Sequence, residues 1–168
     1  MHTHTPPHAA PSAGTPAFAV ERTLGRLGKW LRLLGFDALL ESECRQGDFP
    51  ACGGAERLLL TRSLRVLQAH PERRPLFIRA DDPFRQIVEV LQALRLPAQE
   101  LRPFSRCLRC NVLIEALPRE AARGRVPDYV YETQPSFSRC PRCRRVYWRG
   151  THTARSFERI QTLLKAAA

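Results

Sequence analysis

Two pairs of cysteines, each separated by two residues, constrain the fold of this 168-residue chain more than any other feature. Cys107 and Cys110 form the first pair, and Cys140 and Cys143 form the second. A Cys-x-x-Cys turn directs both sulfur atoms to one point, so two such turns supply the four thiolates of a tetrahedral zinc site. The pairs predict a structural Zn²⁺ site in a zinc ribbon over residues 104–152.

Two disulfides, or one redox-active pair, are the alternative interpretations of these cysteines. Disulfides are typical of secreted chains, and residues 1–17 contain no apolar core of a signal peptide. No stretch reaches the length of a membrane span either. We therefore expect a cytoplasmic protein that does not engage a membrane. Cys44 and Cys52 are expected to be ordinary small residues rather than a third pair, because their spacing fits no common site.

The chain is strongly basic, and the ribbon region is its most cationic part. The formal net charge is +11, and residues 102–150 hold eleven arginines against four acidic residues. A GC-rich genome also favours Arg over Lys, but it does not explain the excess of positive charge. Such an excess indicates a polyanionic partner such as RNA. The candidate contacts in the ribbon are Arg144, Arg145, Trp148 and Arg149.

The segment between the cysteine pairs has the composition of β-strands. Residues 129–133 (YVYET) and 145–150 (RVYWRG) are rich in aromatic and β-branched side chains, which favour strands. We expect these runs to form a small hairpin that carries the second knuckle.

The preceding residues, 18–103, have the pattern of an α/β domain. Short apolar runs expected to be strands alternate with two amphipathic helices. The strands are expected at 17–20, 37–41, 57–61 and 75–80, and the helices at 22–35 and 83–97. This alternation predicts a three-layer fold with a mostly parallel sheet. A disordered tail over 1–17 and a C-terminal helix over 153–168 complete the expected organisation.

The first helix is amphipathic, with a basic face. Its leucines recur at helical spacing and share one arc. The opposite arc carries Arg22, Arg26, Lys29 and Arg32. We expect this face, together with Arg62 after the third strand, to contact nucleic acid. Gly35 is expected to end the helix, because glycine is the usual residue past a helix C-terminus.

Acidic residues accompany the predicted strands. In parallel α/β sheets, ligands gather beyond the carboxyl ends of the strands. Several carboxylates at one edge could hold Mg²⁺ or Mn²⁺, which activates a water for attack on a phosphodiester. The candidate catalytic residues are Glu21, Asp81, Asp82 and Asp37.

Each of these acids also has a structural alternative. Asp82 directly precedes Pro83, which is the pattern of a helix N-cap and the first helical position. Glu21 could favour the dipole of the helix that follows it. Asp37 could close the turn after the first helix. Asp81 is then the stronger metal candidate.

Several motifs resemble one known family. They are LGRLGKWLRLLGFD, LLLTR, DDPFRQ, PFSRCLRCN, RVPDYVYET and CPRCRRVYWRGTH, in this order between residues 18 and 152. Together they resemble the PIN-like ribonuclease domains fused to a zinc ribbon, named after the C-terminal domain of the Mut-seven exonuclease. The resemblance implies a PIN-like α/β sandwich, divalent-metal-dependent RNA cleavage, and a ribbon that helps hold the RNA.

The sequence departs from this family pattern at two acidic positions. The resemblance implies Asp where this chain has Glu21 and where it has Ser63; Asp48 is a possible substitute. Two hypotheses therefore follow: a metal-dependent endoribonuclease, or a catalytically degenerate PIN-like domain that acts as an RNA-binding module. A protein partner for the basic ribbon is a third hypothesis.

Overall fold

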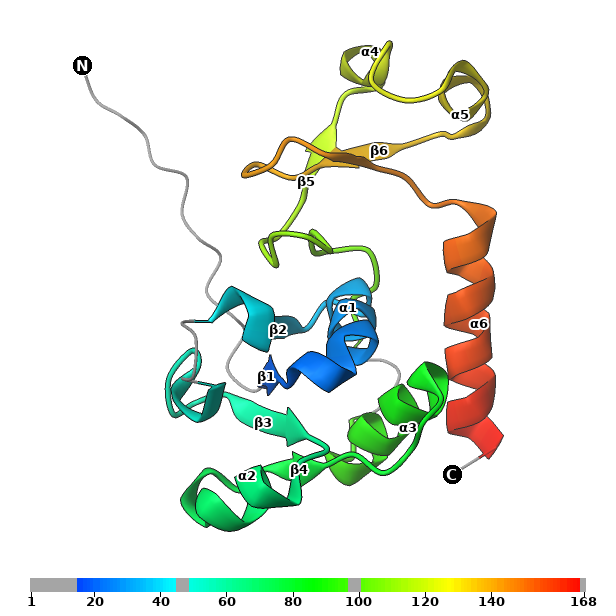
Figure 1. Ribbon diagram of the computed structural model, residues 1–168. Helices are drawn as coiled ribbons and strands as arrows, with labels where there is room; N and C mark the ends of the chain where they lie inside the picture. The colour runs from blue at the N-terminus through cyan, green and yellow to red at the C-terminus, as the bar shows by residue number, and fades with distance from the viewer. Residues whose placement is uncertain (1–14, 45–48, 97–100, 167–168) are drawn as a thin grey trace, which may run out of the picture.

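The computed structural model describes residues 15–44, 49–96 and 101–166 (Figure 1). Most of the tail predicted over 1–17, and Asp48, lie outside these described residues. The first strand already begins at Ala17, inside the range expected to be tail. No described helix is long and apolar enough to cross a membrane.

A four-stranded parallel sheet forms the centre of the larger domain. Its strands are β1 (Ala17–Val20), β2 (Asp37–Leu40), β3 (Leu58–Thr61) and β4 (Leu76–Phe77). Their order is β2-β1-β3-β4, and every neighbouring pair is parallel. The expected parallel sheet is therefore confirmed. The carboxyl ends of β1, β3 and β4 lie at one edge.

One face of the sheet is covered by α1 (Gly25–Leu33) and α3 (Pro83–Ala93). Apolar side chains from both helices share the main core with alternate residues of the strands, among them Phe18, Val20 and Leu60. Gly28 lets α1 approach the sheet closely, because a Cβ there would lie 2.2 Å from Leu40 Cδ2. α1 is followed by Gly35 at φ +99°, which confirms the expected helix stop.

The opposite face of the sheet has a thinner cover. Ala19 and Leu59 point to this side and pack with residues of the 49–52 segment and with Val66 of α2 (Leu64–Ala69). Cys44 and Cys52 form a disulfide here, with Cα atoms 5.7 Å apart. The expectation that these two cysteines are unpaired was wrong, since β2 and the segment before β3 bring them together through tertiary packing.

A second, smaller sheet belongs to the ribbon, which we define as residues 104–150. Its strands are β5 (Glu115–Leu117), β6 (Phe137–Arg139) and β7 (Val146–Tyr147), antiparallel and in that order. Two short helices, α4 (Arg119–Ala122) and α5 (Asp128–Thr133), cover it.

The strand predicted over 129–133 was wrong, because these residues form α5. Pro127 precedes the helix and Asp128 lies in its first turn, and both are favourable at a helix N-terminus. The β-branched and aromatic residues that suggested a strand therefore lie along a helix, where their side chains follow the helical spacing. Val130 is buried against Phe137 in a small separate core.

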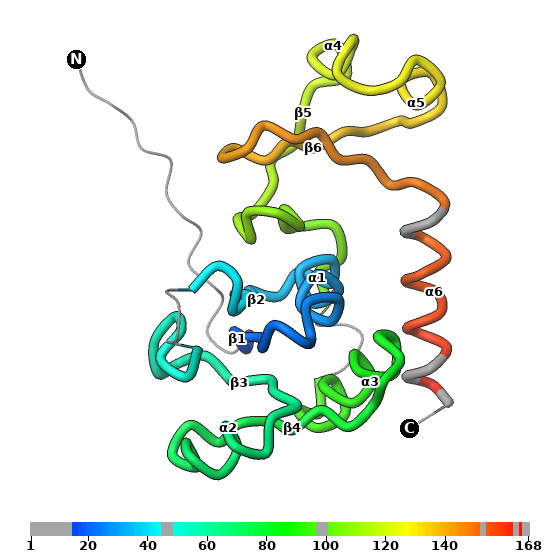
Figure 2. Tube along the Cα trace, in the orientation of Figure 1, coloured from blue at the N-terminus to red at the C-terminus, as the bar shows by residue number. Residues whose placement is uncertain are grey.

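The C-terminal helix α6 (Thr151–Ala166) leads from the ribbon back to the larger domain. It lies alongside α3 in both the ribbon and the tube views (Figures 1 and 2). Ile160 is fully buried in the main core, and the Arg159 guanidinium lies 4.1 Å from the Phe84 ring centroid. The helix thus begins two residues earlier than expected and completes the α/β core.

Candidate functional site

The four cysteines of the two pairs meet at one point in the ribbon. Their sulfur atoms all lie within 4.8 Å of one another, and Cys107 Sγ is 3.7 Å from Cys143 Sγ. Tetrahedral Zn²⁺ with Zn–S bonds of 2.3 Å requires sulfur atoms about 3.8 Å apart. The donor set and its spacing therefore fit a structural zinc ion, as the sequence predicted.

The two knuckles share one backbone geometry. In each, the N–H of the second cysteine donates to the sulfur of the first, at 3.2 and 3.4 Å. The residue after each pair, Asn111 in one and Arg144 in the other, adopts a left-handed conformation with φ near 60°. This turn directs both sulfur atoms of a pair to the same side.

Hydrogen bonds prepare the Cys107 thiol for metal binding. Burial acts to raise its pKa, but bonds from the Tyr147 hydroxyl, 3.0 Å away, and from the N–H groups of Cys110 and Arg109 outweigh burial. The pKa of Cys107 falls to about 6 as a result. The Tyr147 contact also connects β7 directly to the metal site.

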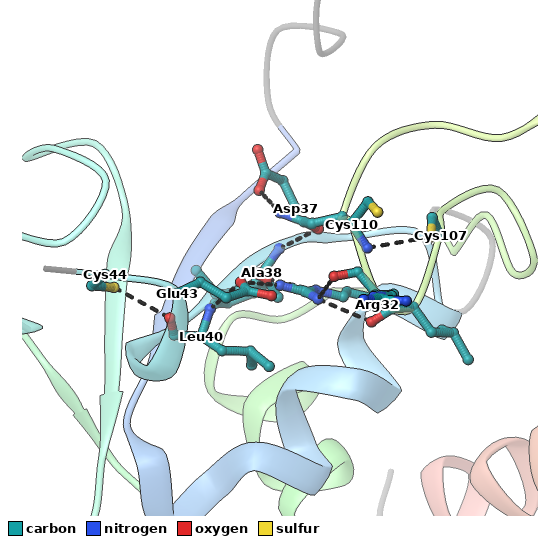
Figure 3. A network of polar contacts seen from close by, with 12 residues as sticks. Arg32, Asp37, Ala38, Leu40, Glu43, Cys44, Cys107 and Cys110 are labelled. Atoms are coloured by element: carbon teal, nitrogen blue, oxygen red, sulfur yellow. Dashed lines mark hydrogen bonds and ion pairs between the residues drawn. The ribbon is translucent and has the colours of Figure 1, made fainter. Parts of the chain in front are cut away.

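Arg32 fastens the first knuckle to the α/β domain, so its predicted role in nucleic-acid binding was wrong. Its side chain is 1% exposed. The Nε–H donates to Ala38 O at 2.8 Å, and Nη1 donates to Leu108 O and Arg109 O, inside the knuckle, at 2.9 and 3.2 Å. Nη2 lies 2.5 Å from a Glu43 carboxylate oxygen (Figure 3). The knuckle covers the end of the helix face that the sequence assigned to solvent.

Asp37 belongs to the same junction, which we call the knuckle clamp (Arg32, Asp37, Glu43, Arg57 and Asn111). Its carboxylate accepts hydrogen bonds from Arg57 at 2.7 and 3.0 Å and from the Asn111 side chain at 2.6 Å. Burial acts to raise the pKa of Asp37, but these bonds outweigh it and hold the pKa below 3.8.

Asp37 was wrongly grouped with the metal-binding acids. It pairs with the first residue of β1, whereas Glu21 follows the last. Four residue steps along the strand separate the two positions, a distance of about 13 Å. The two carboxylates thus lie at opposite edges of the sheet.

Glu21 and Asp81 do reach the same edge, and both contact Arg62. Glu21 Oε2 accepts hydrogen bonds from Thr61 Oγ1 at 2.9 Å and from the Arg62 N–H at 2.6 Å. The Arg62 guanidinium lies 2.7 Å from Asp81 Oδ1. The loop that carries Asp81 is tied down by Glu89, which accepts from the N–H groups of Arg79 and Ala80 at 3.0–3.1 Å.

The remaining side chains at this edge serve as helix caps. Asp82 accepts from the N–H groups of Phe84 and Arg85, both at 3.1 Å, so the capping alternative holds. Ser63 accepts from the Val66 N–H at 3.3 Å and caps α2. Among the described residues, the cysteine cluster is the only group of three or more potential ligands close enough to share one ion. Glu21 and Asp81 are thus the two carboxylates at this edge that could contribute ligands to a divalent ion.

A basic concavity lies beside the second knuckle. We call it the arginine cup; its volume is about 500 Å³, and its lining includes Arg109, Arg125, Arg144 and Arg145. All four arginines are exposed, and none forms an ion pair within the described part of the chain. Sequence reasoning missed Arg109 and Arg125, because only the fold brings the α4–α5 connection and the first knuckle to this place.

The other predicted nucleic-acid contacts have mixed surroundings. Arg22, Arg26 and Lys29 are exposed on α1 and its preceding turn. Arg149 is exposed and lies 5.6 Å from the Phe104 ring centroid, while Trp148 packs against the small core of the ribbon. Their contact with RNA stays a prediction.

Comparison with models of known protein families gives a match over most of the chain. A family model described as the Mut7-C RNAse domain matches residues 16–160. Neither the curated proteins nor the solved structures gave a significant match.

Proposed function

The chain belongs to the Mut7-C RNAse domain family, which indicates a nuclease-type, RNA-related function, and we propose that this protein is an RNA-binding module. In this proposal the zinc ribbon binds the RNA backbone, and the PIN-like domain no longer supports efficient metal-dependent cleavage. The observation that carries the proposal is the arginine cup beside the second zinc knuckle.

The arginine cup has the properties of a phosphate-binding surface. A guanidinium presents a planar fork of donors that matches phosphate oxygens, and the four arginines of the cup are exposed rather than paired with acids of the described chain. Two of them, Arg144 and Arg145, directly follow Cys143, so a bound metal would hold their backbone in place. Preorganised donors lose less conformational entropy when a ligand binds.

The sheet edge supports the second half of the proposal. A divalent ion there would supply an activated water for phosphodiester hydrolysis. The edge offers two carboxylates, Glu21 and Asp81, and Arg62 already engages both. Ser63 supplies a hydroxyl where the family pattern implies a third carboxylate, and that hydroxyl caps α2.

RNA binding is tested by fluorescence anisotropy with a labelled single-stranded oligonucleotide over a salt series. Contacts to four phosphates of a single strand predict a slope of log K against log salt of about −3. The double variant Arg144→Ala/Arg145→Ala should reduce the magnitude of this slope by about 1 to 2. Arg65→Ala/Arg85→Ala removes the same charge from exposed positions of the larger domain and serves as the control. Equal losses in both variants would show that only net charge matters.

Cleavage is tested separately, with end-labelled RNA in Mn²⁺ and in EDTA. We expect no turnover above background in either. Cleavage in Mn²⁺ that disappears in EDTA and in Asp81→Asn would contradict the proposed loss of catalysis.

A metal-dependent endoribonuclease is the second candidate, and one observation favours it. Glu21 and Asp81 converge on one residue, as carboxylates of a metal pocket would. The variant Glu21→Asp/Ser63→Asp restores the family pattern at both positions. A gain of Mn²⁺-dependent cleavage in this variant alone would show that these two substitutions account for the weak site.

A further inference from the structure

An uncharged groove adjoins the arginine cup. We call it the aromatic groove; its volume is about 600 Å³, and its lining includes Tyr129, Val130, Thr133, Gln134, Val146 and Trp148. No lining residue carries a charge, although the surrounding ribbon is strongly basic. Val146 of β7 lines both the groove and the cup, so the two concavities are neighbours on the ribbon.

Tyr129 is the unusual feature of this groove. Its side chain is 69% exposed, although its neighbours Val130 and Tyr131 contribute to the small core of the ribbon. Tyr129 and Thr133 are one helical turn apart on α5 and both line the groove. The acids of α5, Asp128 and Glu132, each lie one position earlier and so occupy a neighbouring arc. The helix α5 therefore presents the Tyr129 ring to the groove, and its two acidic residues are not part of the groove lining.

We propose that the aromatic groove takes an unstacked base of single-stranded RNA while the arginine cup holds an adjacent phosphate. This inference rests on the proposed function, and it adds that the ribbon distinguishes single-stranded from duplex RNA. An aromatic side chain stacks on any base, because every base has a π-face. The bases of an A-form duplex are paired and stacked inside the helix, so they cannot enter such a groove. Charge complementarity places the phosphate on the cup side of Val146 and the base on the uncharged side.

The metal site holds one wall of the groove in place. Tyr147, the last residue of β7, lines the groove, and its hydroxyl lies 3.0 Å from Cys107 Sγ. The same strand therefore connects the zinc ligands, the cup and the groove. A base would enter a surface that is formed before RNA binds.

The test compares Tyr129→Ala with Tyr129→Phe, which retains the ring and loses only the hydroxyl. Tyr129 is largely exposed, so both variants should melt close to the wild-type temperature. Affinities are measured by anisotropy for a single-stranded oligonucleotide and for a duplex of the same sequence. A 2-aminopurine base in the single strand reports stacking through its quenched fluorescence.

We expect Tyr129→Ala to weaken single-strand binding by about 5- to 150-fold, to reduce the 2-aminopurine quenching, and to leave duplex binding unchanged. Tyr129→Phe should behave as the wild type. Unchanged single-strand affinity in Tyr129→Ala would overturn the proposal and favour a protein occupant, and equal losses for single strand and duplex would also overturn it.

The two proposals fail in different ways. Wild-type protein that binds neither RNA would refute the proposed function itself. Salt-sensitive binding that requires Arg144 and Arg145 but is indifferent to Tyr129 would refute the aromatic groove alone.

Discussion

Replacing Arg32 with alanine should destabilise both domains, although the sequence places this residue on a helix face typical of solvent exposure. The guanidinium donates to three carbonyl oxygens, two of them in the first zinc knuckle, and lies 2.5 Å from Glu43. Alanine would leave these acceptors without their donor in a buried junction. Removing one partner of a buried ion pair costs about 3–5 kcal/mol.

The lower end of this range applies here, since the Glu43 side chain is 32% exposed and keeps the N–H of Leu40 as a donor at 3.0 Å. If the 168-residue chain unfolds as one cooperative unit, a loss of about 3 kcal/mol lowers its melting temperature by roughly 6–12 °C. Because two of the lost bonds hold the knuckle that carries Cys107 and Cys110, zinc should also dissociate faster.

The assay combines thermal unfolding, followed by circular dichroism, with zinc release to a colorimetric chelator at 25 °C. Arg26→Ala is the matched control, because it removes the same side chain from an exposed position of the same helix. The melting temperature and the zinc-release rate of Arg32→Lys should lie between those of Arg32→Ala and Arg26→Ala, since a single ammonium cannot reach all four acceptors. If Arg32→Ala has the same melting temperature and the same zinc-release rate as Arg26→Ala, the knuckle clamp does not stabilise the junction and the reasoning is refuted.

Three further predictions follow from the described contacts. The pKa of Asp37 is held below 3.8, so its stabilising contribution is present above that pH and is lost as the pH falls through the folded pKa. In urea unfolding between pH 5 and 3, the free energy of unfolding should therefore fall more steeply for wild type than for Asp37→Asn. Parallel curves for the two proteins would contradict this. In denaturant unfolding, the Cys44→Ser/Cys52→Ser variant should have a free energy of unfolding about 2–3 kcal/mol lower than wild type, because the disulfide no longer closes a short loop. Metal analysis should still find one zinc ion per chain. If both thiols react freely in the native wild type, the disulfide is excluded. Gly28→Ala should lower the free energy of unfolding by about 1–3 kcal/mol through overpacking, because the new Cβ would lie 2.2 Å from the Leu40 side chain of β2. The control Gly25→Ala places its Cβ where no atom lies within 4 Å, so denaturant unfolding should show almost no change.

Features with a local cause were predictable from the sequence. The cap at Asp82 follows from an Asp-Pro pair at the start of a helical pattern, and the stop at Gly35 follows from the left-handed conformation that glycine permits. The period-two alternation of the strands determines which side chains face each layer. The strand prediction for 129–133 failed because the helix and strand preferences of a short aromatic run are close, while Pro127 and Asp128 favour a helix start directly before it.

The site shows the same division. The zinc ligands were predictable from the residue pattern, because a Cys-x-x-Cys turn brings its two sulfur atoms together through a few backbone dihedrals, and only one further pair with this spacing is present. The sequence also determined the basic character of the ribbon. Three further features required the folded chain: the contacts of Arg32 and Asp37 between the α/β domain and the first knuckle, the pairing of Cys44 with Cys52, and the meeting of four arginines in one cup. Residue periodicity identifies the arc of a helix or the face of a strand, but it does not identify the residues that pack against that surface, because the tertiary packing positions them.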